Sequence, residues 1–406
     1  MGMAHVEFDC ERAMRLAGHA SPLPRRIVQV GAGAFGSMVA ESLVREGLGV
    51  HWTVIDPDDL LPHNLARHTL GIFDVSAPKA VNLAYRLRGL RVDVAADPIV
   101  ADFLNPGAHH QAITAALQGA DLVIDAAASV PVARFLSDHE GSARRASVFF
   151  NPAGTSVVLM LESRDRGTNL RMLEAAYYGE ILRVPELHDH LTQSTGLMPY
   201  AGACRAVTSR IPASRAQVLS GLAAAGLMGA LAKAESGLKV PSLAANGAVA
   251  VHHLVIGEIR SVPVLGWTVT LPRVLEDRIL QMRAAKLPAE TGGVLFGIVD
   301  LVKSRIDLVE AWPEPADSRG IETEFVRGTK GLRQAVEQAI GKTLDQVRYV
   351  GEWHSHPRRA RTRPSCIDLN QIAWLTSTLS MDGCPGLMLI AGDGGVSINL
   401  GAGRRV

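Results

Sequence analysis

Two histidines and an aspartate in the last third of the chain have the spacing of a metal site. His354 and His356 stand at the end of a segment rich in β-branched and aromatic residues, 347–353, which predicts a strand. Side chains two residues apart on a strand share a face, so both imidazoles can be directed at one point. Asp368 opens an apolar-periodic segment, which predicts the first turn of a helix. Two nitrogens and one carboxylate oxygen suit a catalytic Zn²⁺, whose fourth position is kept for water.

Zinc at such a site would make hydroxide available near neutral pH, because the metal lowers the pKa of its bound water. A general base must still accept the proton, and Glu290 is the candidate. It precedes two glycines and a strand predicted from Val294, and we expect these glycines to let the backbone pass close to a ligand. An isolated His-x-His pair usually consists of ordinary strand histidines, but the complete ordered set favours a metal site.

The set has the order of one known motif, formed by Glu290, His354-x-His356-Pro357 and Ser365-x-x-Asp368. It resembles the motif of the JAMM (JAB/MPN) metalloproteases, which hydrolyse peptide or isopeptide bonds after the C-terminal glycine of ubiquitin-like proteins. The resemblance implies that His354, His356 and Asp368 bind zinc. It also implies that Glu290 takes the proton from zinc-bound water and that Ser365 helps to hold the oxyanion. Residues 357–364 make this loop one residue longer than is usual in the family.

Arginines dominate that same loop, at positions 358, 359, 361 and 363. The simpler interpretation is a solvated loop. The functional interpretation is a contact with an acidic surface of the substrate.

A second group of residues, near the start of the chain, could bind a nucleotide. Residues 26–30 predict a strand that leads into Gly31, Gly33 and Gly36 and then a helix, and a second predicted strand ends at Asp56. This βαβ unit, with an acidic residue about 20 positions after the glycines, is typical of dinucleotide binding. The glycines let the backbone approach phosphate, and a helix N-terminus favours negative charge. The pattern alone does not distinguish NAD from ATP.

The next segment has a more specific spacing: Asp56-Pro-Asp58-Asp59, His63-Asn64-Leu65-Ala66-Arg67-His68 and then Lys79. Over about residues 25–257 the chain resembles the ThiF/MoeB adenylation family, the catalytic core of ubiquitin-activating enzymes. The resemblance implies an ATP site bordered by the three glycines and the acidic pair Asp56 and Asp58, with Asp56 on the ribose. Asn64, Arg67 and Lys79 would contact the phosphates and stabilise charge as a carboxylate attacks the α-phosphoryl group.

Three features depart from that family. His68 replaces a glutamine, and the paired C-x-x-C zinc site of many relatives is missing. Ala128 stands where adenylating members usually carry an aspartate that helps to bind Mg²⁺. Asp125 or another acid must therefore hold the Mg²⁺, or adenylation is slow or absent.

Cys204 is a candidate nucleophile. It is predicted to lie in a glycine-containing loop before a helix that starts near Ala213, where Arg205 and the helix could lower its pKa. In activating enzymes that pass their ubiquitin-like protein onward, a cysteine in this part of the chain forms a thioester. A buried structural cysteine is the alternative. The four cysteines are far apart, which fits a reducing cytoplasm.

Composition sets the broad class. The length of 406 residues allows two or three domains, and 47% hydrophobic with 20% charged residues is typical of soluble globular proteins. A net charge of +1 argues against a nucleic-acid or membrane-surface role that depends on overall charge. Residues 1–23 show no signal peptide, and the most apolar run, 218–232, is too short to span a bilayer. We therefore expect a cytoplasmic protein.

We predict an α/β protein, with a Rossmann-like ThiF adenylation domain followed by an α/β JAB/MPN metalloprotease domain. The predicted boundaries are an N-terminal extension (1–24), the adenylation domain (25–260), a linker (261–266) and the metalloprotease domain (267–402). The Ala/Leu/Met-rich helix predicted over 213–234 would form core or a dimer face, since the relatives are typically homodimers.

The combined prediction is a bifunctional enzyme of a bacterial ubiquitin-like conjugation pathway, of a kind implicated in phage defence. It would use ATP and Mg²⁺ to activate a C-terminal glycine, and Zn²⁺ to cleave the bond that this glycine makes. Its partners would be a ubiquitin-like protein and a conjugating-type enzyme. One alternative is activation and processing of a ThiS- or MoaD-like sulfur carrier. Another is a degenerate adenylation domain that only recruits substrate to the protease. An NAD-linked dehydrogenase is disfavoured by Asn64, Arg67 and Lys79.

Overall fold

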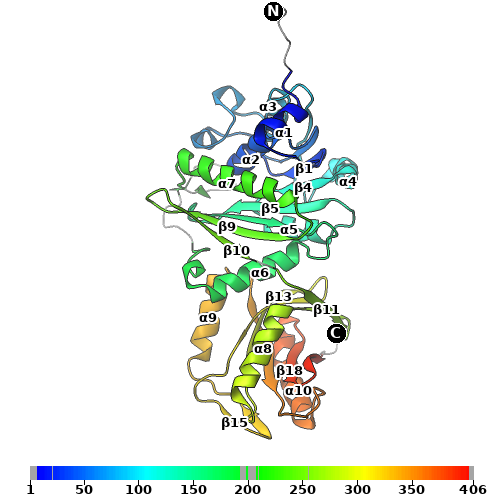
Figure 1. Cartoon of the computed structure of the whole chain (residues 1–406), viewed down its shortest axis with the longest axis vertical. Coiled ribbons are helices and arrows are strands. Elements are labelled where there is room, and N and C mark those ends of the chain that lie inside the picture. Colours follow the sequence, from blue (N-terminus) through cyan, green and yellow to red (C-terminus); the bar gives the residue numbers. More distant parts are fainter. Residues whose placement is uncertain are drawn as a thin grey trace, which may run out of the picture. The chain divides into compact units, whose positions relative to one another are not determined.

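The computed structural model describes residues 7–20, 22–192, 210–254 and 256–401, together with the backbone of two short paired strands, β7 (Met198–Pro199) and β8 (Val207–Thr208). The chain divides into two compact units. The first takes its residues from 1–173 and 192–256, and the second from 174–191 and 257–406. Both units combine a large sheet with helices, which confirms the predicted α/β class (Figure 1).

The first unit is built on an eight-stranded sheet with the order β10-β9-β6-β5-β4-β1-β2-β3. Its strands are β1 (Arg26–Val30), β2 (His51–Ile55), β3 (Ala95–Ile99), β4 (Leu122–Asp125), β5 (Arg144–Phe150), β6 (Val157–Leu161), β9 (Gly237–Leu243) and β10 (Val249–Leu254). The five strands from β3 to β5 are parallel, and the other three are antiparallel. The chain runs outward from β1 to β3 and returns to β4 on the other side of β1. The carboxyl ends of β1 and β4 therefore flank a switch point, where open α/β sheets bind ligands.

Helices cover this sheet. They are α1 (Cys10–Ala17), α2 (Ala34–Arg45), α3 (Lys79–Arg88), α4 (His110–Gly119), α5 (Val130–Asp138) and α7 (Ala213–Leu231), with the 3₁₀ turns η1 (Pro62–Ala66), η2 (Ile72–Asp74) and η3 (Gly107–His109). Figure 1 shows α7 lying along the sheet, where it packs against α2, β6 and β9. Leu43 of α2 and Leu219, Ala223 and Leu227 of α7 are fully buried in the core. The apolar character of α7 thus serves the core.

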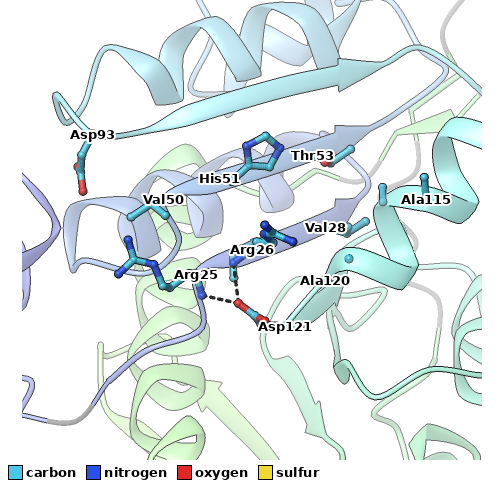
Figure 2. A pocket seen from close by; sticks show the side chains of 13 residues that line it. Arg25, Arg26, Val28, Val50, His51, Thr53, Asp93, Ala115, Ala120 and Asp121 are labelled. Carbon is cyan, nitrogen blue, oxygen red and sulfur yellow. Dashed lines mark hydrogen bonds between the residues drawn. The ribbon is translucent and has the colours of Figure 1, made fainter.

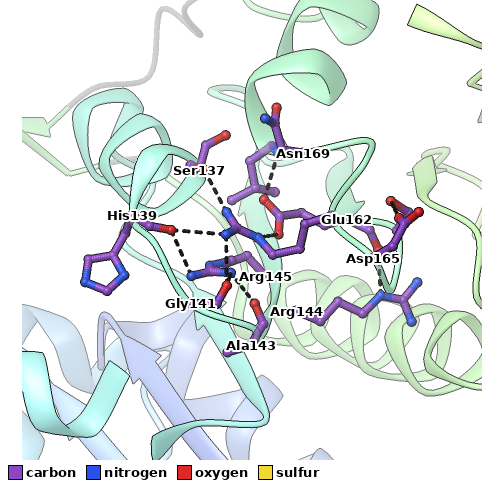
Figure 3. Close-up of polar contacts among 12 residues, drawn as sticks. Ser137, His139, Gly141, Ala143, Arg144, Arg145, Glu162, Asp165 and Asn169 are labelled. Atoms are coloured by element: carbon purple, nitrogen blue, oxygen red, sulfur yellow. Dashed lines mark hydrogen bonds and ion pairs between the residues drawn. The ribbon is translucent and has the colours of Figure 1, made fainter. Parts of the chain in front are cut away.

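A buried polar network fixes the start of α6 (Leu170–Arg183). The fully buried Glu162 accepts hydrogen bonds from Arg166 Nε (2.9 Å) and from the Leu170 amide (3.1 Å). Arg145 donates to main-chain carbonyls of the 137–143 segment (Figure 3). Arg166 donates to carbonyls of the same segment. Burial raises the pKa of Glu162, and burial lowers the pKa of Arg145 to about 10. These bonds hold the first turn of α6 in the first unit, whereas the residues from 174 onward belong to the second.

The second unit has a seven-stranded sheet with the order β11-β12-β14-β13-β17-β18-β19. Its strands are β11 (Ile259–Val264), β12 (Trp267–Pro272), β13 (Gly292–Asp300), β14 (Arg305–Trp312), β17 (Arg348–Ser355), β18 (Gly386–Gly392) and β19 (Gly395–Gly401), with a separate hairpin of β15 (Arg319–Ile321) and β16 (Glu324–Val326). Its remaining elements are α8 (Arg273–Lys286), α9 (Leu332–Lys342), α10 (Cys366–Leu379) and the 3₁₀ turns η4 (Pro185–Leu187) and η5 (Ser380–Asp382).

Alternation along β18 assigns the two faces of this sheet. Leu387 and Leu389 join the core that contains Leu275 and Ile279 of α8, whereas Met388 and Ile390 pack against Ile372 and Leu375 of α10. On β17, Trp353 belongs to the α8 side. Since successive strand residues point to opposite faces, residues 352, 354 and 356 face α10. The two candidate histidines therefore lie on the face that α10 covers.

The linker predicted over 261–266 differs from the structure. Residues 259–264 form β11, which pairs antiparallel with β12 in the second sheet. Leu265 and Gly266, with φ of 48° and 78°, make the tight turn between these strands. The segment is thus the edge hairpin of the second unit.

Within the described residues, no helix has both the length and the apolar character that crossing a bilayer requires.

Candidate metal centre and nucleotide site

The two histidines and the aspartate converge in the second unit. His354 Nε2 lies 3.1 Å from Asp368 Oδ1, and His356 Nε2 lies 3.3 Å from Asp368 Oδ2. The two Nε2 atoms are 3.3 Å apart, and all three side chains are buried. Burial raises the pKa of Asp368, but hydrogen bonds with both histidines outweigh it and hold this pKa well below its usual range. The three residues form a compact donor cluster.

Neighbouring backbone groups orient two of the three ligands, His356 and Asp368. His356 Nδ1 lies 2.6 Å from the carbonyl oxygen of Arg361, which can only accept, so Nδ1 carries a proton and Nε2 is the nitrogen that faces the cluster. Ser365 is the N-cap of α10: its Oγ accepts from the Asp368 amide at 3.3 Å, while Asp368 Oδ2 accepts from the Ser365 amide at 2.6 Å. This reciprocal capping box accounts for the Ser-x-x-Asp spacing. Ser365 thus has a structural role beside the chemical one that the motif implies.

Glu290 lines the same pocket from the segment just before β13. Its neighbour two positions on, Gly292, pairs directly with His354 of β17. Glu290 is partly buried, and burial raises the pKa of its carboxyl group while the two histidines oppose that shift. Gly292 and Gly293, which were predicted to let the backbone pass close to a ligand, also have a packing role in the structure. A Cβ on Gly292 would collide with Phe325, and one on Gly293 with the carbonyl of Trp312. Protein packing requires both glycines.

A second polar cluster adjoins the metal cluster on the same strand and helix, β17 and α10. The sequence analysis did not predict it. Glu352 accepts hydrogen bonds from Arg327 Nε (3.1 Å), Arg327 Nη2 (2.8 Å), Tyr349 Oη (3.1 Å) and Gln371 Nε2 (2.6 Å). Glu352 precedes His354 by two on β17, and Gln371 follows Asp368 by three on α10. Those two spacings were the available signal, because each puts a residue on the ligand-bearing face of its element.

The metal cluster opens into a pocket of about 570 Å³. The β15–β16 hairpin contributes Phe325 and Val326 to its wall, and α10 contributes Ile367 and Trp374, which are 68% and 56% exposed. Glu290 and both histidines also line it. Exposed apolar walls around a polar floor suit a site that binds an extended peptide.

The donor set fits a catalytic zinc ion. Two neutral imidazole nitrogens and one carboxylate are the ligands of three-residue zinc sites, and the pocket leaves the remaining side open. The Arg361 carbonyl supplies the outer hydrogen bond that metal-ligating histidines typically make.

In the first unit, the predicted nucleotide loop follows β1 at the switch point. Gly31 has φ of 98°, and a Cβ there would lie 2.7 Å from the carbonyl of Ala126. A Cβ on Gly36 would meet the Gly31 carbonyl. A Cβ on Gly33 would have no described atom within 4 Å, and Gly33 begins α2 with no side-chain cap. The space beside Gly33 and the uncapped helix N-terminus suit a phosphate group.

The other predicted nucleotide residues surround this loop. Asp56 Oδ2 accepts from the Ala32 amide at 2.6 Å and Oδ1 from the Asp58 amide at 2.9 Å, and burial raises its pKa. Lys79 Nζ pairs with Asp58 Oδ2 at 3.0 Å. Asn64 Oδ1 accepts from the Leu61 amide, and burial lowers the pKa of Arg67. The D-x-D carboxylates thus shape the loop and orient the lysine.

His68, which replaces a glutamine of the resembled family, is buried and supports the glycine loop. Its Nε2 lies 2.8 Å from the Ala32 carbonyl, and its Nδ1 accepts from the Leu70 amide at 3.1 Å. Both contacts are satisfied by the neutral tautomer with the proton on Nε2. Burial lowers the pKa of His68 to about 4. A glutamine could make the same two hydrogen bonds.

Asp125 does not fit the predicted Mg²⁺ role. It is fully buried at the end of β4, where Oδ1 accepts from the Ala127 amide (3.0 Å) and Oδ2 from Ser147 Oγ (2.8 Å). Burial raises its pKa to about 6. Ala128, with φ of 51°, has no side chain that could bind an ion. Cys204, the candidate nucleophile, lies outside the described residues.

A further pocket, of about 900 Å³, lies at the amino ends of the central strands of the first sheet, opposite the carboxyl ends where the glycine loop lies. Figure 2 shows Arg25, Arg26 and His51 around it, at the amino ends of β1 and β2, and the Asp121 carboxylate accepts from both arginine amides. Ligand sites of open α/β sheets form at the carboxyl ends of the strands. This pocket is therefore separate from the predicted nucleotide site.

Comparison with known proteins gives two family matches and several partial relatives. Residues 17–170 match the ThiF family, and residues 272–399 match the prokaryotic homologs of the JAB domain. The chain is 36% identical over 115 residues to a CD-NTase/cGAS isopeptidase of Enterobacter hormaechei subsp. hoffmannii. This aligned region covers 28% of this chain and 61% of that protein. It is 33% identical over 122 residues to the SAMP-activating enzyme E1 of Haloferax volcanii, covering 30% and 43% of the two chains.

A third relative is the ATP-dependent ubiquitin transferase-like protein Cap2 of Escherichia coli, 36% identical over 88 residues, which cover 21% of this chain and 15% of that one. The matches span less than two thirds of the length of each of these relatives. The two family matches fall in the two compact units, one in each. The chain is therefore a fusion of a ThiF-family domain with a JAB-type domain.

Proposed function

We propose that the chain is a bifunctional enzyme of a bacterial ubiquitin-like protein pathway. The first unit would activate a C-terminal glycine with ATP, and the second would hydrolyse the bond that this glycine makes to a tail or a target lysine. The cluster of His354, His356 and Asp368 beside Glu290, in a JAB-type domain, is the observation that carries the proposal. Relatives named as an isopeptidase, as an activating enzyme E1 and as an ATP-dependent ubiquitin transferase-like protein support the pairing. A role in antiphage defence is part of the proposal.

Hydrolysis would use residues of the second unit. Zn²⁺ held by the three ligands would supply a Lewis acid and lower the pKa of a water molecule. Glu290, whose pKa is raised by burial, would take a proton from that water and give it to the leaving amine. Ser365 Oγ already accepts from the Asp368 amide, so its O–H remains available to donate to the oxyanion.

Activation would use residues around the glycine loop. The α2 N-terminus beside Gly33 would receive phosphate, and Arg67 and Lys79 would stabilise charge on the α-phosphoryl group. The glycine carboxylate would attack the α-phosphorus and pyrophosphate would leave. Transfer of the acyl group to Cys204 would release AMP and form a thioester. A conjugating-type enzyme would accept this product, and we propose that the active species is a homodimer, which sedimentation can test.

The test of hydrolysis uses the full-length chain loaded with Zn²⁺ and a ubiquitin-like protein encoded beside it, fused after its C-terminal glycine to a short tail. We expect Glu290→Gln to bind zinc normally but to cleave the tail about 10²- to 10⁴-fold more slowly, as loss of a general base predicts. Glu322→Gln, at an exposed hairpin position, is the matched control and should cleave normally. Zinc-free wild-type protein, or undiminished cleavage by Glu290→Gln, would contradict the proposal.

A second candidate is favoured by Asp125 and Ala128, which leave β4 without an open carboxylate for Mg²⁺. In that case the first unit would bind the ubiquitin-like protein without activating it. ATP–pyrophosphate exchange that depends on the ubiquitin-like protein supports activation, and its absence together with tight binding supports recruitment.

The sulfur-carrier alternative remains, and the SAMP-activating relative is consistent with it. A reductant-sensitive adduct that Cys204→Ala abolishes supports conjugation, whereas sulfide incorporation into the carrier supports sulfur transfer.

A further inference from the structure

We propose that the loop between His356 and Ser365 is a docking surface for an acidic protein segment beside the bond to be cleaved. This surface, the arginine loop, consists of residues 357–364 and carries Arg358, Arg359, Arg361 and Arg363. The proposal deepens the hydrolytic half of the proposed function and rests on it for the identity of the reaction. Binding of the acidic segment can be measured without any reaction.

The backbone of the arginine loop is held at several points. The Arg359 amide donates to Asp393 Oδ2 (2.7 Å), and the Arg361 carbonyl lies 2.6 Å from His356 Nδ1. Ser397 Oγ donates to the Thr362 carbonyl (2.6 Å), and Arg283 donates to the Pro357 carbonyl (3.2 Å). A backbone held at both ends and in its middle presents its side chains with little further loss of conformational entropy on binding.

The four arginine side chains of the loop are unpaired. All four residues are exposed, and among the residues that the structure describes none of their guanidinium groups makes an ion pair or a hydrogen bond. The nearby acid, Asp393, already pairs with Arg283 at 2.7 Å, and Arg358 adds only a longer-range contribution to its lowered pKa. Elsewhere in this unit Arg278, Arg305 and Arg327 are paired with acids. The loop thus concentrates four guanidinium groups that have no acidic group in direct contact among the described residues.

Position and chemistry indicate the partner. Pro357 and Ala360 of the loop line the metal pocket, so an acidic group bound here would lie next to the reacting bond. Guanidinium groups recognise carboxylates in a bidentate manner. Nucleic acid is the less favoured ligand, because the whole chain has a net charge of only +1 and the basic surface is a single loop. We therefore commit to carboxylates of a protein substrate.

The test compares two synthetic isopeptides with the full-length, zinc-loaded chain. In both, a fluorophore-labelled Gly-Gly is joined to a lysine side chain, which is flanked either by Asp and Glu or by Asn and Gln. We expect kcat/KM to favour the acidic substrate by about tenfold at low salt, through KM, with the preference lost at high salt. Fluorescence anisotropy of the acidic peptide alone gives the binding preference independently.

Two charge-matched variants locate the effect. In the loop variant, Arg358, Arg359 and Arg363 are changed to Gln, while Arg361 is kept because its carbonyl orients His356. We expect the preference to disappear while kcat on the neutral substrate is retained. In the control, Lys303, Lys330 and Lys342, none of which lines the metal pocket, are changed to Gln. The control removes the same charge and should keep the preference.

Three outcomes would overturn the proposal: equal cleavage and binding of both peptides, a preference that survives in the loop variant, or its loss in the control. Binding of a single-stranded DNA oligonucleotide more tightly than the acidic peptide, abolished in the loop variant, would assign the surface to nucleic acid instead. If neither isopeptide is cleaved but the acidic one binds through the loop, the reaction assignment fails and the docking surface stands.

Discussion

Gly31 and Gly33 stand two residues apart in one loop, but different neighbours account for them. Gly31 adopts φ of 98° against the Ala126 carbonyl, so protein backbone excludes a side chain there. Gly33 has no described atom within 4 Å of its Cβ direction. The second glycine, at the N-cap of α2, leaves room for a ligand that approaches the loop.

We therefore expect opposite effects of alanine at these positions. Gly31→Ala should lower the melting temperature, because a strained left-handed residue costs about 1–2 kcal/mol before any collision. Gly33→Ala should keep the wild-type melting temperature but bind ATP at least about tenfold more weakly, as isothermal titration would measure. Unchanged ATP affinity of Gly33→Ala would place the phosphates elsewhere.

His68 makes the stability of the first unit depend on pH. Burial lowers its folded pKa to about 4, against 6.5 for an exposed imidazole. As pH falls from 7, the unfolded chain takes up the proton first, so stability is present above pH 6.5 and is lost between 6.5 and 4. By pH 5 the loss attributable to His68 is on the order of 2 kcal/mol.

His68→Gln provides the test, because glutamine can donate to the Ala32 carbonyl and accept from the Leu70 amide without titrating. We expect the free energy of urea unfolding of the first unit to decrease less from pH 7 to 5 in this variant than in the wild-type protein. Identical decreases in both proteins would rule out His68 as the titrating group.

At the scale of elements, the metal site depends on how α10 is held against β17. The Glu352–Gln371 hydrogen bond joins the two elements one step from the ligands, and Arg327 adds the segment after the β15–β16 hairpin. We expect Glu352→Gln to lower the free energy of unfolding by about 3 kcal/mol, because it leaves Arg327 largely buried without its partner. Zinc affinity, measured by competition with a chelator, should fall with it.

The double variant Glu352→Gln with Arg327→Met is the control for this effect. Removing both charges should restore much of the lost stability, since an apolar side chain no longer needs a partner. If the stability lost in the double variant equals the sum of the losses in Glu352→Gln and Arg327→Met alone, the two residues are not coupled.

Ser365 has two roles that substitution can separate. Ser365→Ala removes both the N-cap of α10, worth about 1 kcal/mol, and the hydroxyl group. Ser365→Asp keeps an N-cap acceptor but has no hydroxyl donor. We expect both variants to lose activity and only alanine to lose stability. Full activity of the stable aspartate variant would limit Ser365 to capping.

The sequence was sufficient for those parts of the site that depend on local geometry. Alternation on β17 and the capping-box spacing of Ser365 and Asp368 are properties of one strand and one helix turn. Arg327 could not be predicted, because the strands of the hairpin before it have only three residues each and no clear pattern. The burial of Asp125 depends on Ser147 of the neighbouring strand, and such pairing across strands is not readable from spacing.

At the scale of the whole molecule, the two units have separate hydrophobic cores. A ligand that binds one folded unit stabilises that unit by mass action, by about 2.7 kcal/mol at a hundred times its Kd. We expect calorimetry of the metal-free chain to show two transitions, with Zn²⁺ raising one and ATP raising the other. A single transition shifted by both ligands would show that the units unfold together.

The division of α6 limits how this protein can be recombined. Residues 174–191 belong to the second unit, where Arg183 and Arg278 both approach the buried Glu310. A gene fragment that starts at Gly257 would encode the complete metal motif but would omit this stretch. A fragment that encodes only residues 257–406 therefore lacks part of the second unit. An exchange of this unit between related genes would also have to transfer the coding sequence for residues 174–191, which lies between the two stretches of the first unit.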